Sequence, residues 1–204
     1  VSKLMNTDEK EKYVEEIQAT SPNGEAYAVE MDIISKNSIQ SCLSDVVSKF
    51  GKIDVLVNNA YPRNKNYGRK FEDVEYSDFC ENINLHLGGY FLVSQQFAKY
   101  FSKIEYGHII TISSIYGMVP PRFDIYENTQ MTMPVEYAVI KSALLHLNKY
   151  LTNLYKKSGI RFNCISPGGI FDEQPSEFVK NYNKYAGQIG MLEPDNISNV
   201  LLFL

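Results

Sequence analysis

The sequence predicts an α/β protein built on a doubly wound, mostly parallel sheet. Strand-like and helix-like segments alternate along the 204 residues. Residues 53–57 form a short apolar run broken only by Asp54, as expected where helices cover both faces of a sheet. Polar or glycine-containing groups follow the strand-like runs. Alternation of this kind implies right-handed crossovers between parallel strands.

The first half of the chain contains two strand-like and two helix-like segments. Residues 25–33, EAYAVEMDI, and 52–60, KIDVLVNNA, have strand character. Between them, 38–50 places apolar side chains at helical spacing and is followed by Gly51, a residue suited to ending a helix. A long helix is predicted from about Val74 to Lys103.

The second half repeats the alternation. GHIITISS at 107–114 predicts a strand, and 136–157 predicts a helix with a leucine-rich stripe and basic residues near its C-terminal end. IRFNCIS at 160–166 predicts a further strand that PGG at 167–169 terminates. We expect one domain over 1–204.

The composition excludes several classes of function. With 20 basic and 24 acidic residues and a net charge of -4, the chain has no field that would attract nucleic acid or an anionic membrane. Its three cysteines and three histidines have no metal-ligand or disulfide spacing, so no metal is expected. No apolar run or leader pattern indicates a membrane span or export. The expected location is the cytoplasm and the expected partner a small molecule.

The predicted strand ends indicate where such a molecule binds. Asp32, residues 58–60, Ser113 with Ser114, and residues 167–169 each follow a strand. Ligands of open parallel sheets collect beyond the carboxyl ends of the strands, so these groups should converge on one rim. Tyr137 and Lys141, in the segment YAVIK, are one helical turn apart and share a helix face.

Five motifs in order give a family resemblance. The sequence resembles the short-chain dehydrogenases/reductases over residues 26–172 in five motifs: DVLVNNA, NINLHLGGYF, ITISSIYG, YAVIK and NCISPGGI. Within that family, its general sequence pattern is most similar to the flagellin-modification protein A type of oxidoreductase. The resemblance implies a Rossmann-like fold, NAD or NADP as cofactor, and hydride transfer between a secondary alcohol and a ketone. For the subgroup it implies a sugar or amino-sugar substrate for flagellin or surface glycans.

The resemblance also implies the catalytic residues Asn84, Ser114, Tyr137 and Lys141. A phenol with an ordinary pKa of about 10 needs tuning to act as a base, and an ammonium about 4 Å away is worth roughly three pKa units. Lys141 is the expected source. Ser114 would hydrogen-bond the substrate oxygen. Asn84 would hold a water for proton relay, although a core asparagine is the alternative and Asn82 competes for the role.

The implied cofactor contacts extend over several segments. Asp32 and Ile33 would border the adenine, and residues 58–60 the adenosine side, unless Asn58 and Asn59 only form a turn. Pro167, Gly168 and Ile170 would present backbone groups to the nicotinamide, or merely terminate the strand. The implied cofactor-binding residues are Asp32, Ile33, Asn58, Asn59, Ala60, Tyr137, Lys141, Pro167, Gly168 and Ile170.

Departures from the family pattern set further expectations. No glycine-rich turn follows a strand, so the chain is expected to lack the first βαβ portion and the last strand of a longer protein. The segment between Ser114 and Tyr137 is long and should border the site. Its Arg122, Tyr126, Asn128 and Thr129 could bind a polyol. Residues 171–185 should form a lid over the substrate.

Two functions remain open from the sequence. The first is the NAD(P)-dependent oxidoreductase; the alternative is a non-catalytic binding or assembly subunit with the same fold. Under either hypothesis, helices 84–103 and 136–157 would pair between subunits in a homodimer or homotetramer.

Overall fold

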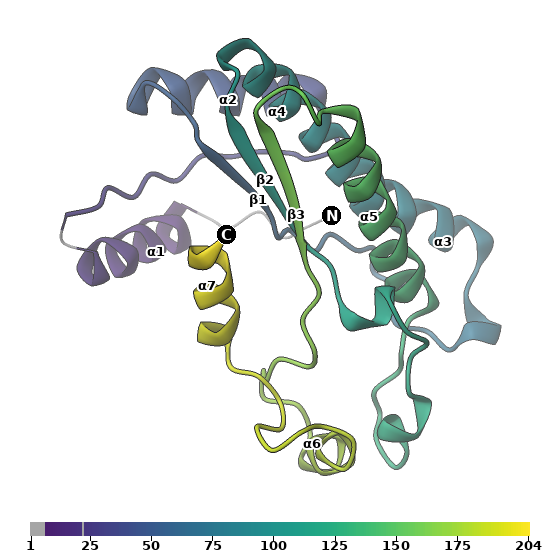
Figure 1. The fold of residues 1–204 in the computed structure, drawn as a ribbon. Helices are drawn as coiled ribbons and strands as arrows, with labels where there is room; N and C mark the ends of the chain where they lie inside the picture. Colours follow the sequence, from purple (N-terminus) through teal and green to yellow (C-terminus); the bar gives the residue numbers. More distant parts are fainter. Residues whose placement is uncertain (1–6, 22) are drawn as a thin grey trace.

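The protein is described here by a computed structural model, which describes residues 7–21 and 23–204. Three parallel strands, β1 (Val55–Asn58), β2 (Gly107–Ile112) and β3 (Ile160–Ile165), form a sheet in the order β1-β2-β3. The predicted α/β class, the parallel pairing and these three strands are confirmed. Figure 1 shows the helices arranged around this sheet.

The helices have the following bounds. They are α1 (Thr7–Thr20), α2 (Lys36–Phe50), α3 (Tyr76–Ile83), α4 (Gly89–Ile104), α5 (Val135–Leu154), α6 (Ser176–Asn183) and α7 (Pro194–Phe203). Helix α2 begins at the capping hydroxyl of Ser35 and ends at Gly51, whose φ of 82° few other residues adopt. The sequence predicted α2 and α5, but not α1.

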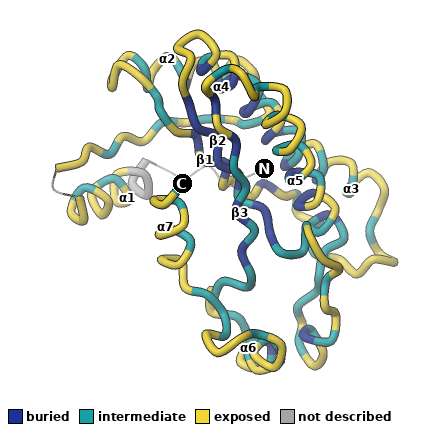
Figure 2. Tube along the Cα trace, viewed as in Figure 1, coloured by how far each residue is buried: buried dark blue, intermediate teal, exposed yellow. Residues whose placement is uncertain are grey.

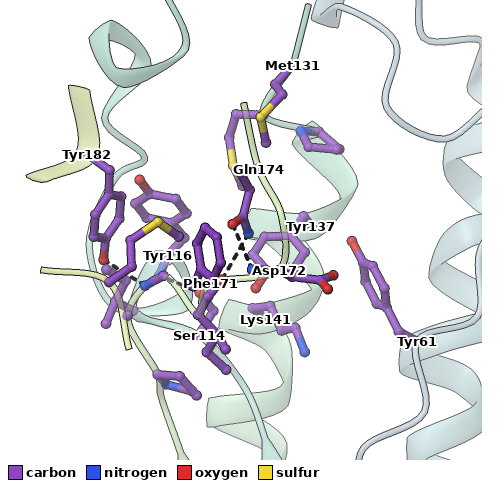
Figure 3. Close-up of a pocket in the computed structure, with 18 of the residues that line it drawn as sticks. Tyr61, Ser114, Tyr116, Met131, Tyr137, Lys141, Phe171, Asp172, Gln174 and Tyr182 are labelled. Atoms are coloured by element: carbon purple, nitrogen blue, oxygen red, sulfur yellow. Dashed lines mark hydrogen bonds between the residues drawn. The ribbon is translucent and has the colours of Figure 1, made fainter. Parts of the chain in front are cut away.

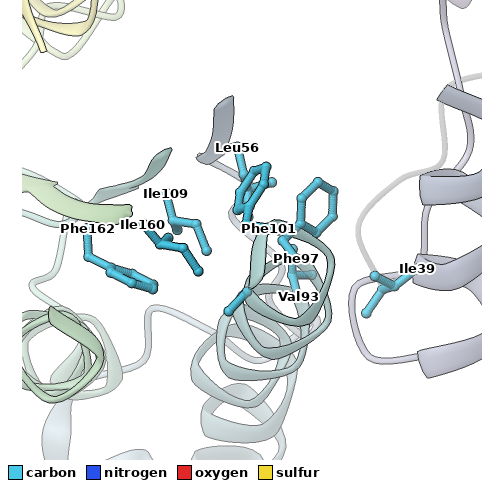
Figure 4. Packing of buried hydrophobic residues seen from close by; sticks show 9 residues of the cluster. Ile39, Leu56, Val93, Phe97, Phe101, Ile109, Ile160 and Phe162 are labelled. Carbon is cyan, nitrogen blue, oxygen red and sulfur yellow. The ribbon is translucent and has the colours of Figure 1, made fainter. Parts of the chain in front are cut away.

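One face of the sheet carries the hydrophobic core. Side chains of alternate strand residues point to this face, and they pack against α4, with α2 and α5 on its flanks. Figures 2 and 4 show the buried strands and the packing of α4 against them. The buried members are Ile39, Leu56, Val93, Phe97, Ala98, Phe101, Ile109, Ile160 and Phe162.

The opposite face of the sheet is more polar. His108 and Arg161 point to this side, where the Arg161 guanidinium donates a hydrogen bond to the Leu204 carbonyl at the end of α7. Val55 and Val57 of β1 are half exposed on the same side. On this side β1 is therefore left partly exposed, whereas His108 and Ile110 of the central strand are each 2% exposed.

The predicted strand at 25–33 was wrong. The segment is extended, but it makes no ladder with β1 or with any other strand among the described residues. Figure 1 draws it as a trace without an arrow. A strand needs a neighbour to satisfy its backbone groups, and here only Met31 and Ile33 pack on the core. The local sequence of residues 25–33 therefore specifies an extended backbone, but it does not specify pairing with another strand.

The predicted long helix is interrupted. Between α3 and α4 the chain forms one π-helical turn, Asn84–Gly88, so the run from Tyr76 to Ile104 is helical but changes its register midway. The helix predicted over 136–157 also ends earlier, at Leu154, and 155–159 form a turn.

Candidate active site

The ends of β2 and β3 are joined by backbone hydrogen bonds. Ser113 donates its N–H to the Ile165 carbonyl at 2.7 Å, and Ile115 donates to the Pro167 carbonyl at 2.9 Å. These bonds continue the parallel ladder beyond the strands. The serine pair and the PGG segment are thereby held together at one edge of the sheet, as the sequence predicted.

Helix α5 brings Tyr137 and Lys141 to this edge. The Ser113 hydroxyl donates to the Lys141 backbone carbonyl at 2.8 Å. The chain after Ser114 passes so close to α5 that a Cβ on Gly117 would lie 2.6 Å from the Lys141 carbonyl carbon. Only glycine permits this approach without a shift of the backbone. The strand end and the helix are thus locked in register.

Ser114 and Tyr137 are coupled directly. Ser114 is buried, and its Oγ accepts a hydrogen bond from the Tyr116 N–H at 3.2 Å. The Ser114 side chain also lies near enough to the phenol of Tyr137 to act to lower the pKa of Tyr137. A hydroxyl and a phenol therefore meet at one point of the site.

The expected effect of Lys141 on Tyr137 is corrected by the structure. Burial raises the pKa of Tyr137 above its ordinary value of 10.0, and the nearby Ser114 hydroxyl opposes this rise only in part. The Lys141 Nζ lies 5.5 Å from the centre of the Tyr137 ring and donates to the Ile112 carbonyl at 2.8 Å. Because the ammonium lies over the ring and is bonded elsewhere, desolvation of the phenolate outweighs its attraction.

Lys141 is itself perturbed. Its side chain is buried, and this burial lowers the pKa of Lys141 from 10.5 to about 8, while Cys164 opposes the shift. An ammonium has three N–H groups, and one of those of Lys141 is bonded to Ile112. The remaining two N–H groups leave capacity for further acceptors.

These residues line a cavity of about 720 Å³. Figure 3 shows Tyr137, Lys141 and Ser114 in this cavity, with Tyr61 facing them from another segment and with Phe171, Gln174 and Tyr182 on the other side. The loop before α5 contributes Tyr126 and residues 131–134 to the wall. Residues of 171–185 also line the cavity, as predicted for the lid segment.

The structure brings some predicted residues to the cavity and not others. Those lining it are Asn59, Ser114, Tyr137, Lys141, Pro167, Gly168 and Ile170, together with Tyr126 from the long loop. Those that do not line it are Asp32, Ile33, Asn58, Ala60, Asn84, Arg122, Asn128 and Thr129. Residues near the PGG segment and α5 therefore converge, whereas those before β1 do not.

The residues outside the cavity have other contacts. The Asp32 carboxylate accepts from the Ile34 N–H at 3.0 Å, and Ile33 packs against the position of Gly89. Buried Asn58 donates to the Ser94 hydroxyl at 3.1 Å. The Ala60 carbonyl accepts from Tyr90 at 2.7 Å. These contacts brace the carboxyl end of β1 against α4.

Asn84 occupies the first residue of the π turn with its side chain exposed. The competing residue, Asn82, is fully buried and donates to the Glu136 carboxylate at 3.2 Å. Neither asparagine lines the cavity.

Tyr61 is a site residue to which the sequence assigned no role. Its hydroxyl is 2.6 Å from that of Tyr67, and its ring makes an edge contact with the ring of Tyr137 at 5.9 Å. The Lys141 Nζ lies 5.9 Å from the centre of the same ring. Tyr61 therefore forms a wall beside the Tyr137–Lys141 pair. The available signal was a tyrosine directly after the NNA motif.

Known proteins share this fold and sequence pattern. The sequence model of a family described as enoyl-(acyl carrier protein) reductase matches residues 2–204. With its parallel sheet and these motifs, the chain belongs to the short-chain dehydrogenases/reductases, a family of NAD(P)-dependent oxidoreductases that act on CH–OH groups.

Individual relatives cover most of the chain. Post-translational flagellin modification protein A of Campylobacter coli is 40% identical over 181 residues, which are 88% of this chain and 71% of the relative. The 7alpha-hydroxysteroid dehydrogenase of Escherichia coli K12 is 30% identical over 98% of this chain and 74% of its own length. A short-chain dehydrogenase of Leptospira borgpetersenii, whose crystal structure contains bound NAD+, matches this structure with a TM-score of 0.77. The two sequences are 27% identical, and the match covers 95% of this chain and 80% of the Leptospira chain.

Neither a metal cluster nor a membrane helix is found in the described part of the chain. Among the side chains that the structure describes, those of residues 11–21 and 23–204, no three of His, Cys, Asp or Glu are grouped to hold a metal ion. Within the same ranges, no helix has both the length and the apolar character needed to cross a bilayer.

Proposed function

We propose that the chain, as one dinucleotide-binding domain, interconverts a secondary alcohol and a ketone, with Tyr137 exchanging the proton at the substrate oxygen. The observation that carries the proposal is the meeting of Ser114, Tyr137 and Lys141 at one cavity beyond the strand ends. Each is a different chemical group: a hydroxyl donor, a phenol and an ammonium.

The proton chemistry follows from the surroundings of Tyr137. Because its pKa is raised, the phenol is protonated at neutral pH and can donate to an oxygen on which negative charge develops. Ser114 offers that oxygen a second hydrogen bond. In the opposite direction the Tyr137 phenolate takes the proton from the substrate hydroxyl.

A nicotinamide cofactor fits the residues of this cavity. The two remaining N–H donors of Lys141 suit the hydroxyl oxygens of a ribose, and residues 167–170 offer backbone groups to a carboxamide. When bound, the dinucleotide supplies or accepts the hydride. We assign Tyr137, Lys141, Pro167, Gly168 and Ile170 to its nicotinamide half, and Asn59, which also lines the cavity, to the adenosine side.

The substrate class is proposed to be a sugar or amino-sugar derivative for flagellin or surface glycans. The name of the Campylobacter coli relative supports this choice. So does the wall of the cavity, where Tyr126, Thr132 and Gln174 place hydroxyl and amide groups among aromatic rings. Such a lining offers hydrogen bonds to a polyol and flat surfaces for its ring.

The proposed working state is a homodimer or homotetramer in the cytoplasm. A surface groove along α5 is lined by apolar side chains that include Met118, Val119 and Val139. These three side chains are 68%, 54% and 43% exposed. A second copy of the chain would remove this surface from water.

Dinucleotide titration tests the proposed function. The intrinsic tyrosine emission of the protein should be quenched on adding NADH or NADPH, and the preferred nucleotide should support reduction of a panel of nucleotide-linked keto sugars. Quenching that saturates, together with turnover, supports the oxidoreductase. Absence of saturable quenching with both nucleotides would favour the non-catalytic subunit instead.

A further inference from the structure

A basic segment borders one side of the cavity. Residues 61–70, YPRNKNYGRK, contain four basic residues and no acidic one, in a chain whose net charge is -4. A run of basic residues is most often a solvated surface. Of these four residues, however, Arg63 lines the cavity, so its position requires an explanation of its own.

The charged groups of the cavity wall narrow the role of Arg63. Among the described residues that line the cavity, the charged ones are Arg63, Lys141 and Asp172. The Lys141 ammonium donates to the Ile112 carbonyl and is proposed to bind the cofactor ribose. The Asp172 carboxylate repels anions. Arg63 is therefore the cation through which this cavity can hold an anionic group of the substrate.

The backbone beside Arg63 is held in place by α3. Asn64 donates its backbone N–H to the side-chain oxygen of Asn82 at 2.9 Å and its side-chain amide to Asp78 at 2.9 Å. The Asn66 amide donates to both oxygens of Asp78, at 2.9 and 3.0 Å. Both anchoring side chains of α3 are buried. The segment is therefore ordered before a ligand binds, which lowers the entropic cost of binding through Arg63.

Tyr61 connects Arg63 to the reacting groups. The guanidinium carbon of Arg63 lies 5.2 Å from the centre of the Tyr61 ring. The centre of the Tyr137 ring lies 5.9 Å from the same point, and the Lys141 Nζ is also 5.9 Å from it. Figure 3 shows Tyr61 facing Tyr137 and Lys141. A molecule that lies along the Tyr61 ring can therefore reach Arg63 at one end and Tyr137 at the other.

We propose that Arg63 binds a phosphate group of the substrate, while the sugar lies along the Tyr61 ring and its reacting oxygen meets Tyr137. A guanidinium presents paired N–H donors that match two phosphate oxygens, and it stays charged at any physiological pH. The substrate is then a sugar phosphate or a nucleotide-linked sugar. The inference rests on the proposed function and names the anionic part of its substrate.

A phosphate fits this position better than a carboxylate does. Because the Tyr61 ring separates Arg63 from Tyr137, the anionic group must project from the sugar ring, as a phosphate on a ring oxygen does. The same segment also carries Lys65 and Lys70, both exposed. Their charges add a longer-range attraction that a doubly charged phosphate gains from more than a carboxylate does.

Calorimetric titration of the protein tests the proposal. The probes are glucose 1-phosphate, UDP-glucose, glucuronate and glucose. Wild type should bind a phosphate-bearing probe about 10-fold or more tightly than glucose, and the tighter of the two phosphate-bearing probes identifies the source of the phosphate. No preference for phosphate, including no detectable binding of any probe, would overturn the proposal. Glucuronate binding as tight as that of both phosphate-bearing probes would also overturn it.

A pair of variants separates the site from the general charge of the segment. Arg63→Gln removes the charge of an exposed side chain and should fold. Its affinity for the phosphate-bearing probes should fall about 10-fold or more, with that for glucose unchanged. Lys65→Gln is the matched control, because Lys65 is an exposed cation of the same segment that does not line the cavity. It should bind all the probes as wild type does. An equal loss in both variants, or no loss in Arg63→Gln, would overturn the proposal.

Nucleotide titration separates a substrate phosphate from those of the cofactor. Arg63→Gln should bind NADH and NADPH as wild type does, whereas a loss of nucleotide affinity would assign Arg63 to the cofactor and overturn the proposal. Tyr137→Phe separates the two proposals. If Tyr137→Phe is inactive while Arg63→Gln binds the phosphate-bearing probes like wild type, only the role of Arg63 fails; if Tyr137→Phe is active, the proposed function fails.

Discussion

Lys141 shows how one residue serves several parts of the site. Its backbone carbonyl accepts from Ser113, its ammonium donates to Ile112, and that ammonium lies 5.5 Å from the centre of the Tyr137 ring. Holding an ammonium in this buried position has a cost, which appears as the lowered pKa of Lys141. The function proposed for Lys141 and the stability of the fold therefore oppose each other at this residue.

A pH-dependent stability measurement tests this opposition. The pKa of Lys141 is 10.5 when unfolded and about 8 when folded, so between these values the unfolded chain binds more protons and stability rises with pH. The full difference corresponds to roughly 3 kcal/mol. In Lys141→Met this rise should be missing, which denaturant unfolding at pH 7 to 10.5 would measure.

The control for that measurement is Lys149→Met, an exposed lysine of the same helix. It should follow the wild-type pH dependence. An identical pH dependence of Lys141→Met and wild type would show that Lys141 is not held in a desolvated position.

At the residue scale, the sequence predicted the Ser114–Tyr137–Lys141 group but not its electrostatics. Spacing places Tyr137 and Lys141 on one helix face, which is a local property. Whether the ammonium lowers the pKa of the phenol depends on burial and on the Ile112 carbonyl, which are tertiary properties.

At the scale of elements, the contact between the segment after β2 and α5 positions the site. The 3-10 turn Ile115–Gly117 packs on α5 at the backbone of Lys141 and Ser142. Ser114 precedes this turn, and Tyr137 is on the helix. The separation of the turn from α5 therefore sets the distance between the two hydroxyl groups.

Gly117→Ala tests this contact. The added Cβ would lie 2.6 Å from the Lys141 carbonyl and 2.9 Å from the Ser142 nitrogen, so the turn must move away from α5. We expect a loss of about 1–3 kcal/mol in unfolding free energy and a large fall in kcat. Gly187→Ala, which would meet nothing within 4 Å, should behave as wild type in both assays. Full activity of Gly117→Ala would contradict the argument.

Helices and strands were predictable from the sequence where the local residue pattern agrees with the tertiary surroundings of the segment. The strands β1 and β2 contain short apolar runs, β3 alternates apolar residues with Arg161 and Asn163, and α2 has helical spacing with Gly51 at its end. Residues 25–33 have the same local pattern but no strand beside them, which no local signal reveals. The π turn depends on a choice between hydrogen-bond registers that differ little in sequence preference.

At the scale of the whole molecule, the apolar groove on α5 indicates self-association. Val139 lies in this groove on the surface of α5, while neighbouring Ile140 is buried in the core. A charge at Val139 would remain solvated in a monomer and be desolvated in an assembly.

Val139→Glu should therefore shift the protein toward monomer without unfolding it, as sedimentation velocity and circular dichroism would show. Ile189→Glu, at an exposed position outside the groove, is the matched control and should leave the association state unchanged. A Val139→Glu variant with wild-type sedimentation would exclude this groove as the interface.

The most direct measurement of the central claim is turnover by Tyr137→Phe, with NADH and NADPH binding followed in parallel by tyrosine emission. The substitution removes one hydroxyl and keeps the ring that contacts Tyr61. The account predicts a loss of turnover of about 100-fold or more with nucleotide affinity nearly unchanged. Turnover within a few-fold of wild type would contradict it.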